Sequence, residues 1–122
     1  MNTVEGNEIV YGLLMRGNLL LESDDPAQAA VVLERALAEE PRKGSILEAL
    51  GRAEYSCARY REASGRFRDA LEVDPTNDYA HHCLGLCCLK MKRNREAGGH
   101  FKIAWYLSPN EMYREKASRF GA

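Results

Sequence analysis

The chain has 122 residues, a length that suits one compact domain and excludes an enzyme built from two catalytic domains. Apolar residues make up 45% and charged residues 29%, as in folded globular proteins, which excludes an intrinsically disordered tail. The formal net charge of −1 excludes the overall cationic excess of histone-like proteins. We therefore expect a folded protein with no nucleic-acid partner.

The chain offers no signal for export or membrane insertion. Glu5 and Glu8 stand where a secretory signal needs positive charge. The longest uncharged run, residues 79–89, is well short of the roughly 20 residues needed to cross a bilayer. Three of the four cysteines crowd residues 83–88, a spacing that favours reduced thiols over disulfides. These features predict a cytoplasmic location without membrane insertion.

A fixed period of 34 residues runs through the sequence. Pro41, Pro75 and Pro109 are spaced by this interval. The same shift aligns glycines (Gly17, Gly51, Gly85), alanines (Ala29, Ala63, Ala97 and Ala36, Ala70, Ala104), and bulky residues (Leu33, Phe67, Phe101 and Leu13, Leu47, His81). Small residues where helices cross, with a bulky residue beside them, are typical of packed helix pairs.

Over residues 10–111 these columns resemble the tetratricopeptide repeat (TPR), a helix-turn-helix unit of 34 residues. The resemblance implies an all-α, right-handed α-solenoid in a single domain, residues 1–122. Repeats are expected at about 10–43, 44–77 and 78–111, and a capping helix at about 109–120. Arg16, Glu54 and His81 depart from the apolar or aromatic residues of the pattern, so we expect looser packing around them.

Helix pairs are expected in chain order at 7–22 with 26–40, 43–57 with 60–73, and 78–91 with 95–107. Asp25-Pro26 reads as an N-cap followed by proline at the first helical position, and Ser108-Pro109 repeats that signal before the capping helix. In the capping helix, helical spacing places four residues on the covered side: Met112, Tyr113, Ala117 and Phe120.

Residues 81–88 hold two histidines and three cysteines, and His100 follows, so zinc ligand types are present. Known zinc signatures draw two pairs from separate elements, whereas the repeat alignment turns His81 and Cys88 toward the unit's own second helix. This favours core cysteines, with no metal and no cofactor. No cysteine-hydrolase signature surrounds them, so an enzyme is not expected. We expect Gly98-Gly99 either to permit close packing of backbones or to loosen the third unit.

The resemblance implies that protein segments bind along the concave groove lined by the first helix of each unit. The repeat phase assigns the groove Tyr11, Leu14, Asn18, Leu21, Glu48, Arg52, Tyr55, Tyr79, His82, Leu86 and Leu89. Tyrosines with apolar neighbours favour recognition of side chains, because they bury large areas at low entropic cost. The alternative is that some of these residues pack between neighbouring helices.

Charge is uneven along the chain, with a net charge of −6 over residues 1–41 and +5 over residues 42–122. The turns between paired helices carry a basic edge, either a solvated rim or a steering surface for an acidic partner: Arg59, Arg61, Lys92, Arg93 and Arg95. The sequence thus predicts a protein-interaction module or co-chaperone-like adaptor with a protein or peptide partner. The alternative is a self-associating scaffold, a homo-oligomer joined through groove and oppositely charged ends.

Overall fold

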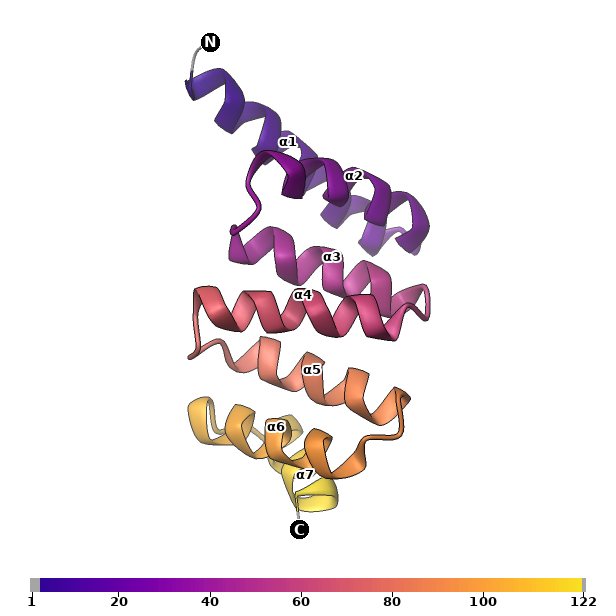
Figure 1. Ribbon diagram of the computed structural model, residues 1–122, viewed down its shortest axis with the longest axis vertical. Helices are drawn as coiled ribbons and strands as arrows, with labels where there is room; N and C mark the ends of the chain where they lie inside the picture. Colours follow the sequence, from indigo (N-terminus) through magenta and orange to yellow (C-terminus); the bar gives the residue numbers. More distant parts are fainter. Residues whose placement is uncertain (1–2, 122) are drawn as a thin grey trace.

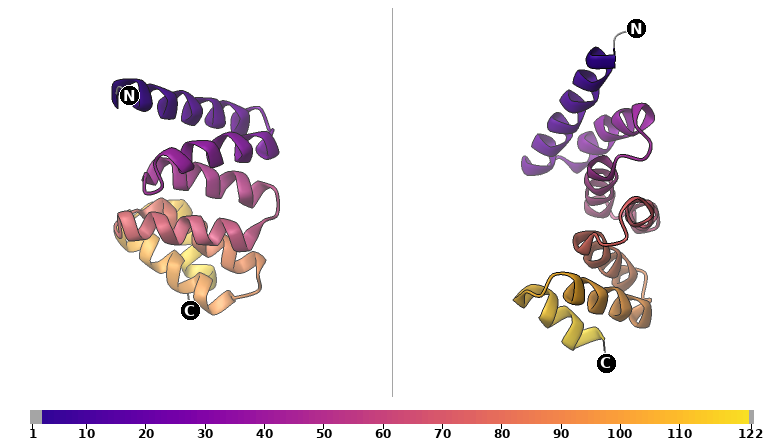
Figure 2. Two further views of the ribbon diagram at one scale, coloured as in Figure 1. Left: turned by 45° about the horizontal axis from the view of Figure 1, so that its top comes forward. Right: turned by 90° about the vertical axis from the view of Figure 1, so that its left-hand side faces the viewer.

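The computed structural model describes residues 3–121 and consists of seven α-helices stacked in chain order (Figure 1). Their bounds are α1 Thr3–Glu22, α2 Pro26–Glu39, α3 Gly44–Ser56, α4 Tyr60–Val73, α5 Asp78–Lys90, α6 Asn94–Leu107 and α7 Glu111–Phe120. Each helix packs against the next, and α3 also contacts α1 and α5. Figure 2 shows the same succession from two further sides. Three helix pairs and a final single helix form an all-α solenoid, with no strand in the part of the chain described.

Polar side chains cap the starts of α2, α5 and α7. Asp25 accepts a hydrogen bond from the Gln28 amide, with Pro26 at the first helical position, which confirms the expected cap. The expectation at Ser108-Pro109 is wrong, because α7 begins at Glu111. Its cap is Asn110, whose side-chain oxygen accepts a hydrogen bond from the Tyr113 amide at 2.9 Å.

The 34-residue period of the sequence recurs in the backbone of the turns. Asp24, Ala58 and Lys92 have φ values of 60°, 61° and 62°, and each follows the first helix of a pair. After each of them, the next amide bonds back to the last turn of that helix, as in a Schellman motif, with one N···O distance of 2.8 Å in all three turns (Asp25 to Leu20, Arg59 to Glu54, Arg93 to Cys88). One turn geometry therefore orients all three helix pairs.

Small residues allow the paired helices to approach closely. A Cβ at Gly51 would lie 2.7 Å from Cζ of Phe67, and Gly85 meets Phe101 in the same way. Both phenylalanines are fully buried in the core. The sequence columns therefore correspond to a real steric requirement, in which the missing Cβ makes room for the aromatic ring.

The capping helix α7 covers the last face of α5 and α6. Tyr113 and Ala117 are buried, and the Tyr113 hydroxyl donates to Asp78 Oδ2 at 2.9 Å. Met112 was expected on this covered face, but its side chain is half exposed. It is the second residue of α7 and lies off the face that Tyr113 and Ala117 bury. A Cβ at Gly98 would collide with the carbonyl oxygen of Phe120, which confirms the expected close approach there.

Gly99 has open space around the position of a Cβ, so of the two alternatives close packing does not apply to this glycine. The outermost residues of the expected domain, 1–2 and 122, lie outside the described residues. Within the described residues, none of the helices combines the length and the apolar character that a membrane crossing requires.

Candidate functional site

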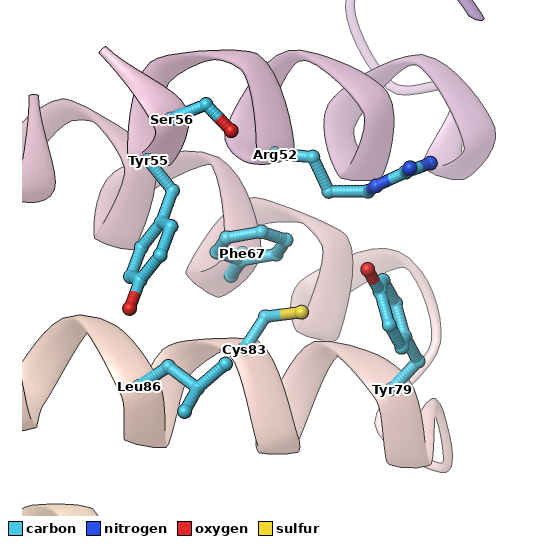
Figure 3. Close-up of a pocket in the computed structure, with 7 residues that line it drawn as sticks. All are labelled: Arg52, Tyr55, Ser56, Phe67, Tyr79, Cys83 and Leu86. Carbon is cyan, nitrogen blue, oxygen red and sulfur yellow. The ribbon is translucent and has the colours of Figure 1, made fainter. Parts of the chain in front are cut away.

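A pocket of about 180 Å³ lies between the first helices of the second and third pairs, and we call it the α3–α5 pocket (Figure 3). It is lined by Arg52, Tyr55 and Ser56 of α3, Phe67 of α4, and Tyr79, Cys83 and Leu86 of α5. Four of the residues assigned to the groove therefore meet around one cavity: Arg52, Tyr55, Tyr79 and Leu86. The repeat phase brings them together although they are up to 34 residues apart in the chain.

The lining of the α3–α5 pocket is mostly uncharged. Burial is the main cause that raises the pKa of Tyr79 above its usual range and that of Cys83 to about 12, so the phenol and the thiol stay neutral at physiological pH. Tyr55 is held edge-on against Tyr60, with ring centroids 5.3 Å apart. Arg52 is exposed at the rim and supplies the one formal charge among the lining residues.

A second hollow of about 250 Å³ lies beside α1 and is lined by Val10, Tyr11, Leu14, Glu40 and Lys43. Two residues of the expected groove, Tyr11 and Leu14, therefore line this hollow. Asn18 and Leu21 line neither cavity, and Leu21 packs against the core formed by α2 and α3.

Three further residues assigned to the groove, Glu48, His82 and Leu89, also line neither cavity. His82 was expected in the groove, but it is 6% exposed and lies between the rings of Phe101 and Tyr113. The expectation is wrong because the capping helix covers this face of α5. Leu89 is half buried against the core, and the Glu48 carboxylate accepts a hydrogen bond from Asn77 at 3.0 Å.

All five residues of the basic edge are exposed: Arg59, Arg61, Lys92, Arg93 and Arg95. They lie in or next to the α3–α4 and α5–α6 turns, and none forms an ion pair with another described residue. Their guanidinium and ammonium groups are therefore available to solvent or to a partner.

Glu54 replaces the aromatic residue of the repeat pattern, and it does not leave a loose contact. Its side chain is 2% exposed, and the Arg66 guanidinium donates to both carboxylate oxygens from α4, at 3.2 to 3.4 Å. Burial still raises the pKa of Glu54, while Arg66 acts in the opposite direction. The ion pair fills the space between the helices, where looser packing was expected.

A surface on the outer side of α6 was also missed. Ile103, Trp105 and Tyr106 are exposed there, Tyr106 by 85%, and with Lys102 and Pro109 they border a shallow hollow of about 750 Å³. The signal available in the sequence was the single tryptophan next to an outward-facing tyrosine in the second helix of the unit.

The structure is similar to solved domains of low sequence identity. It matches the TPR domain of Arabidopsis OM64 with a TM-score of 0.90, 18% identity, and coverage of 95% of this chain and 97% of that one. The second TPR domain of human RPAP3, in complex with the HSP70 peptide SGPTIEEVD, matches with a TM-score of 0.88 and 18% identity. The match covers 96% of this chain and 98% of that one. The Yersinia enterocolitica type III secretion chaperone SycD, in complex with a peptide of the translocator YopD, matches with a TM-score of 0.82 and 16% identity. The match covers 93% of this chain and 88% of that one.

The family model for the tetratricopeptide repeat matches residues 14–56. No curated protein matches the sequence. Helix pairs on a 34-residue period, with repeated turns and glycine–aromatic crossings, define the class as an α-solenoid of helix-turn-helix repeats. Within this class the chain has the fold of tetratricopeptide repeat domains, with three helix pairs followed by a capping helix, and residues 14–56 are similar to the family itself.

Proposed function

We propose that the chain is a protein-interaction module that holds a segment of its partner in the α3–α5 pocket. The observation that carries this proposal is the meeting of Arg52, Tyr55, Tyr79 and Leu86 around one cavity on the face shared by the first helices. Support comes from the fold, because the similar domains of RPAP3 and SycD are described in complexes with peptides.

The chemistry of the pocket favours an apolar or aromatic anchor side chain. Two tyrosines, a leucine and a buried phenylalanine supply apolar surface, and the two hydroxyls can still hydrogen-bond. Burial of apolar area contributes about 25 cal/mol per Å² before the cost of ordering the segment. We therefore expect affinity that depends weakly on salt, with the basic edge acting on the association rate.

The positions that clamp a C-terminal carboxylate in chaperone-binding TPR domains are differently occupied here. Asn18 matches that set, but Leu14, Ala49, Tyr79 and Cys83 stand at the other places and offer neither cations nor a second amide. Ala49 and Cys83 are also buried. We therefore predict no useful affinity for peptides ending in Glu-Glu-Val-Asp, and micromolar binding by calorimetry would contradict this.

The test of the pocket uses a random-peptide display library selected on the immobilised full chain. Replacing Tyr55 and Tyr79 by Ala should weaken the binding of the selected peptides by about 2 kcal/mol, or roughly thirtyfold in affinity, because a few anchor residues supply most of the binding energy. The matched control is Tyr106→Ala, which removes an exposed tyrosine of α6 that does not line the pocket. Circular dichroism checks that every variant keeps its helices.

The outcomes distinguish binding in the α3–α5 pocket from binding at the basic edge. Selected peptides should carry aromatic or aliphatic anchors and bind the Tyr106→Ala variant as tightly as the parent. If the double tyrosine variant binds as tightly as the parent, while reversal of Arg59 and Arg93 to Glu abolishes binding, the pocket is not the site. Reversal of the two arginines is expected instead to slow association and to reduce its salt dependence.

Self-association is a second candidate function, favoured by one observation. Ile9, Met15 and Leu19 of α1 expose about half of their side-chain surface, at the end of the array where no preceding helix of the described chain covers them. An uncovered apolar helix face is a common dimer contact. Light scattering tests it: a concentration-independent monomer would rule out this candidate and leave the pocket proposal intact.

A further inference from the structure

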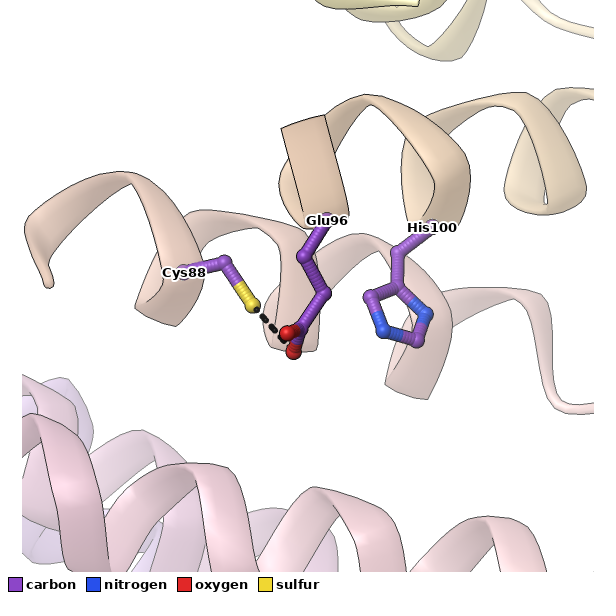
Figure 4. Close-up of side chains that lie close together, drawn as sticks. All are labelled: Cys88, Glu96 and His100. Atoms are coloured by element: carbon purple, nitrogen blue, oxygen red, sulfur yellow. Dashed lines mark hydrogen bonds between the residues drawn. The ribbon is translucent and has the colours of Figure 1, made fainter. Parts of the chain in front are cut away.

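Three side chains of metal-ligand type meet between the two helices of the third pair. Cys88 comes from α5, and Glu96 and His100 come from α6, one turn apart (Figure 4). One ligand atom of each lies within 4.8 Å of the other two, and the Cys88 thiol donates to Glu96 Oε2 at 3.3 Å. No ion is needed to hold them there, because α5 and α6 already pack closely.

A hydrogen-bond chain orients the imidazole of His100. His81 Nδ1 lies 3.3 Å from His100 Nδ1, and His81 Nε2 lies 3.4 Å from the carbonyl oxygen of Pro75. Each contact has a donor when His81 donates from Nε2 to that carbonyl and His100 donates from Nδ1 to His81. His100 Nε2 then carries a lone pair, and Figure 4 shows this nitrogen turned toward Glu96. Metal-binding histidines are commonly fixed by such a partner on the other nitrogen.

The neutral state of both rings fits this role. Burial is the main cause that lowers the pKa of His81 and of His100 below the ordinary value of 6.5. A neutral imidazole is the form that binds a metal. Glu96 is held ionised, because its hydrogen bond with Arg68 lowers the pKa of the carboxyl group.

The equivalent places in the other two pairs contain no comparable set. Sliding by 34 residues replaces Cys88 and His100 by Glu54 and Arg66 in the second pair, which neutralise each other in an ion pair. In the first pair the same positions hold Leu20 and Val32. The third pair is therefore the one in which this position between the helices offers a sulfur and a nitrogen ligand with an adjacent carboxylate.

From this geometry we propose that Cys88, Glu96 and His100 bind a divalent ion of the zinc class, with His81 as the residue that positions His100. Cysteine, histidine and carboxylate are the ligands that Zn²⁺ takes in four-coordinate sites, and a water would complete the tetrahedron. Binding forms a metal–sulfur bond, and the thiol proton leaves for the solvent. Because the thiol must lose its proton to bind the ion, affinity is expected to rise with pH.

Cationic side chains near the cluster disfavour the binding of a cation, but the exposed side of the cluster lets an ion enter from solvent. Arg68 Nη2 lies 2.9 Å from Glu96 Oε2, and Arg93 adds a second cationic group close to Cys88. The side chains of Arg68 and Glu96 are about half exposed, so the guanidinium can leave the carboxylate when an ion arrives from solvent. The other ligand types in this segment do not take part, because His82 lies against the capping helix. Cys87 and Cys88 are both fully buried, but it is the Cys88 thiol that lies within 4.8 Å of ligand atoms of Glu96 and His100.

The test is a titration of the reduced, metal-free full chain with Co²⁺, which reports thiolate ligation and four-coordination in its absorption spectrum. We expect one equivalent to bind with a sulfur-to-cobalt charge-transfer band, and Zn²⁺ to displace it and raise the melting temperature. Cys88→Ser and His100→Gln should remove the band. His81→Gln should weaken binding at least tenfold while keeping the band, as expected of a positioning residue.

The matched control is Cys57→Ser, because Cys57 is the free cysteine outside α5. This variant should bind Co²⁺ like the parent. The proposal is overturned if the folded parent gives no charge-transfer band with excess Co²⁺, if the band survives in Cys88→Ser, or if it disappears in Cys57→Ser. Because no groove residue is involved, these outcomes do not depend on the proposed protein-binding function.

Discussion

The second and third repeats place different chemistry at the same point between their two helices. In the second, Glu54 of α3 and Arg66 of α4 form a closed ion pair in which the carboxylate is buried. In the third, Cys88 of α5 and His100 of α6 occupy the equivalent places, and Glu96 joins them. The backbone around both points is the same, with a Schellman turn after the first helix and a glycine–phenylalanine crossing beside it.

The difference shows which positions the fold requires and which it leaves free. A glycine beside a bulky side chain is needed in each pair, since a Cβ would collide with Leu33, Phe67 or Phe101. The neighbouring position accepts an apolar pair, an ion pair or a cluster of ligands, provided that its polar groups are satisfied. New chemistry can therefore enter the array there without a change of architecture.

The largest expected effect tests the ion pair of the second repeat. Arg66→Val alone leaves the Glu54 carboxylate buried without its partner and should lower the free energy of unfolding by about 3 kcal/mol. Combining Arg66→Val with Glu54→Leu copies the first repeat and should restore or exceed the parent's stability. Urea unfolding at pH 8 gives both values, and a double variant as unstable as the single one would show that the pair itself stabilises the fold.

A smaller effect separates two adjacent glycines of the third repeat. Gly98→Ala places a Cβ against the carbonyl oxygen of Phe120 and should destabilise the chain by roughly 1 to 3 kcal/mol, because the capping helix must move. Gly99→Ala meets open space and should stabilise by up to about 1 kcal/mol through helix propensity. The second repeat carries Ser64 at the place of Gly98, where no capping helix follows. Equal melting temperatures for the two variants would contradict the close contact.

The smallest effect is a pH dependence that belongs to the third repeat, since all three histidines lie there. Burial lowers the folded-state pKa of His81, His82 and His100 below 6.5, so the unfolded chain binds more protons. Stability is therefore full above pH 6.5 and falls as the pH drops below it, by at most about 1.4 kcal/mol per pH unit for each histidine. His82→Phe, with urea unfolding in a chelator between pH 7.5 and 5.5, should flatten this slope. An unchanged slope would mean that His82 is accessible to protons in the folded state.

Much of the fold was predictable from the sequence, because the 34-residue period is imposed by repeated contacts such as that of Gly51 with Phe67. The period also placed Arg52, Tyr55, Tyr79 and Leu86 around one pocket. Helix bounds agree to within two residues except at the start of α1, which begins at Thr3.

The errors arise where the array ends or where a side chain departs from the pattern. His82 follows the groove phase, yet α7 replaces the next repeat and buries it. The start of α7 was misplaced because two cap signals are adjacent, and Asn110 provides the hydrogen bond. The pairing of Glu54 with Arg66 depends on which side chains face each other between two helices, and a period in one sequence does not specify that.

The proposed binding of a partner in the α3–α5 pocket can be located by amide chemical shifts of the labelled chain. Titration with a peptide selected from the random library should shift the amides of Tyr55, Tyr79 and Leu86 first and most strongly, with small changes at Trp105 and Tyr106 on the α6 surface. Shifts centred on α6, or on the basic-edge turns, with the pocket amides unmoved, would contradict the account.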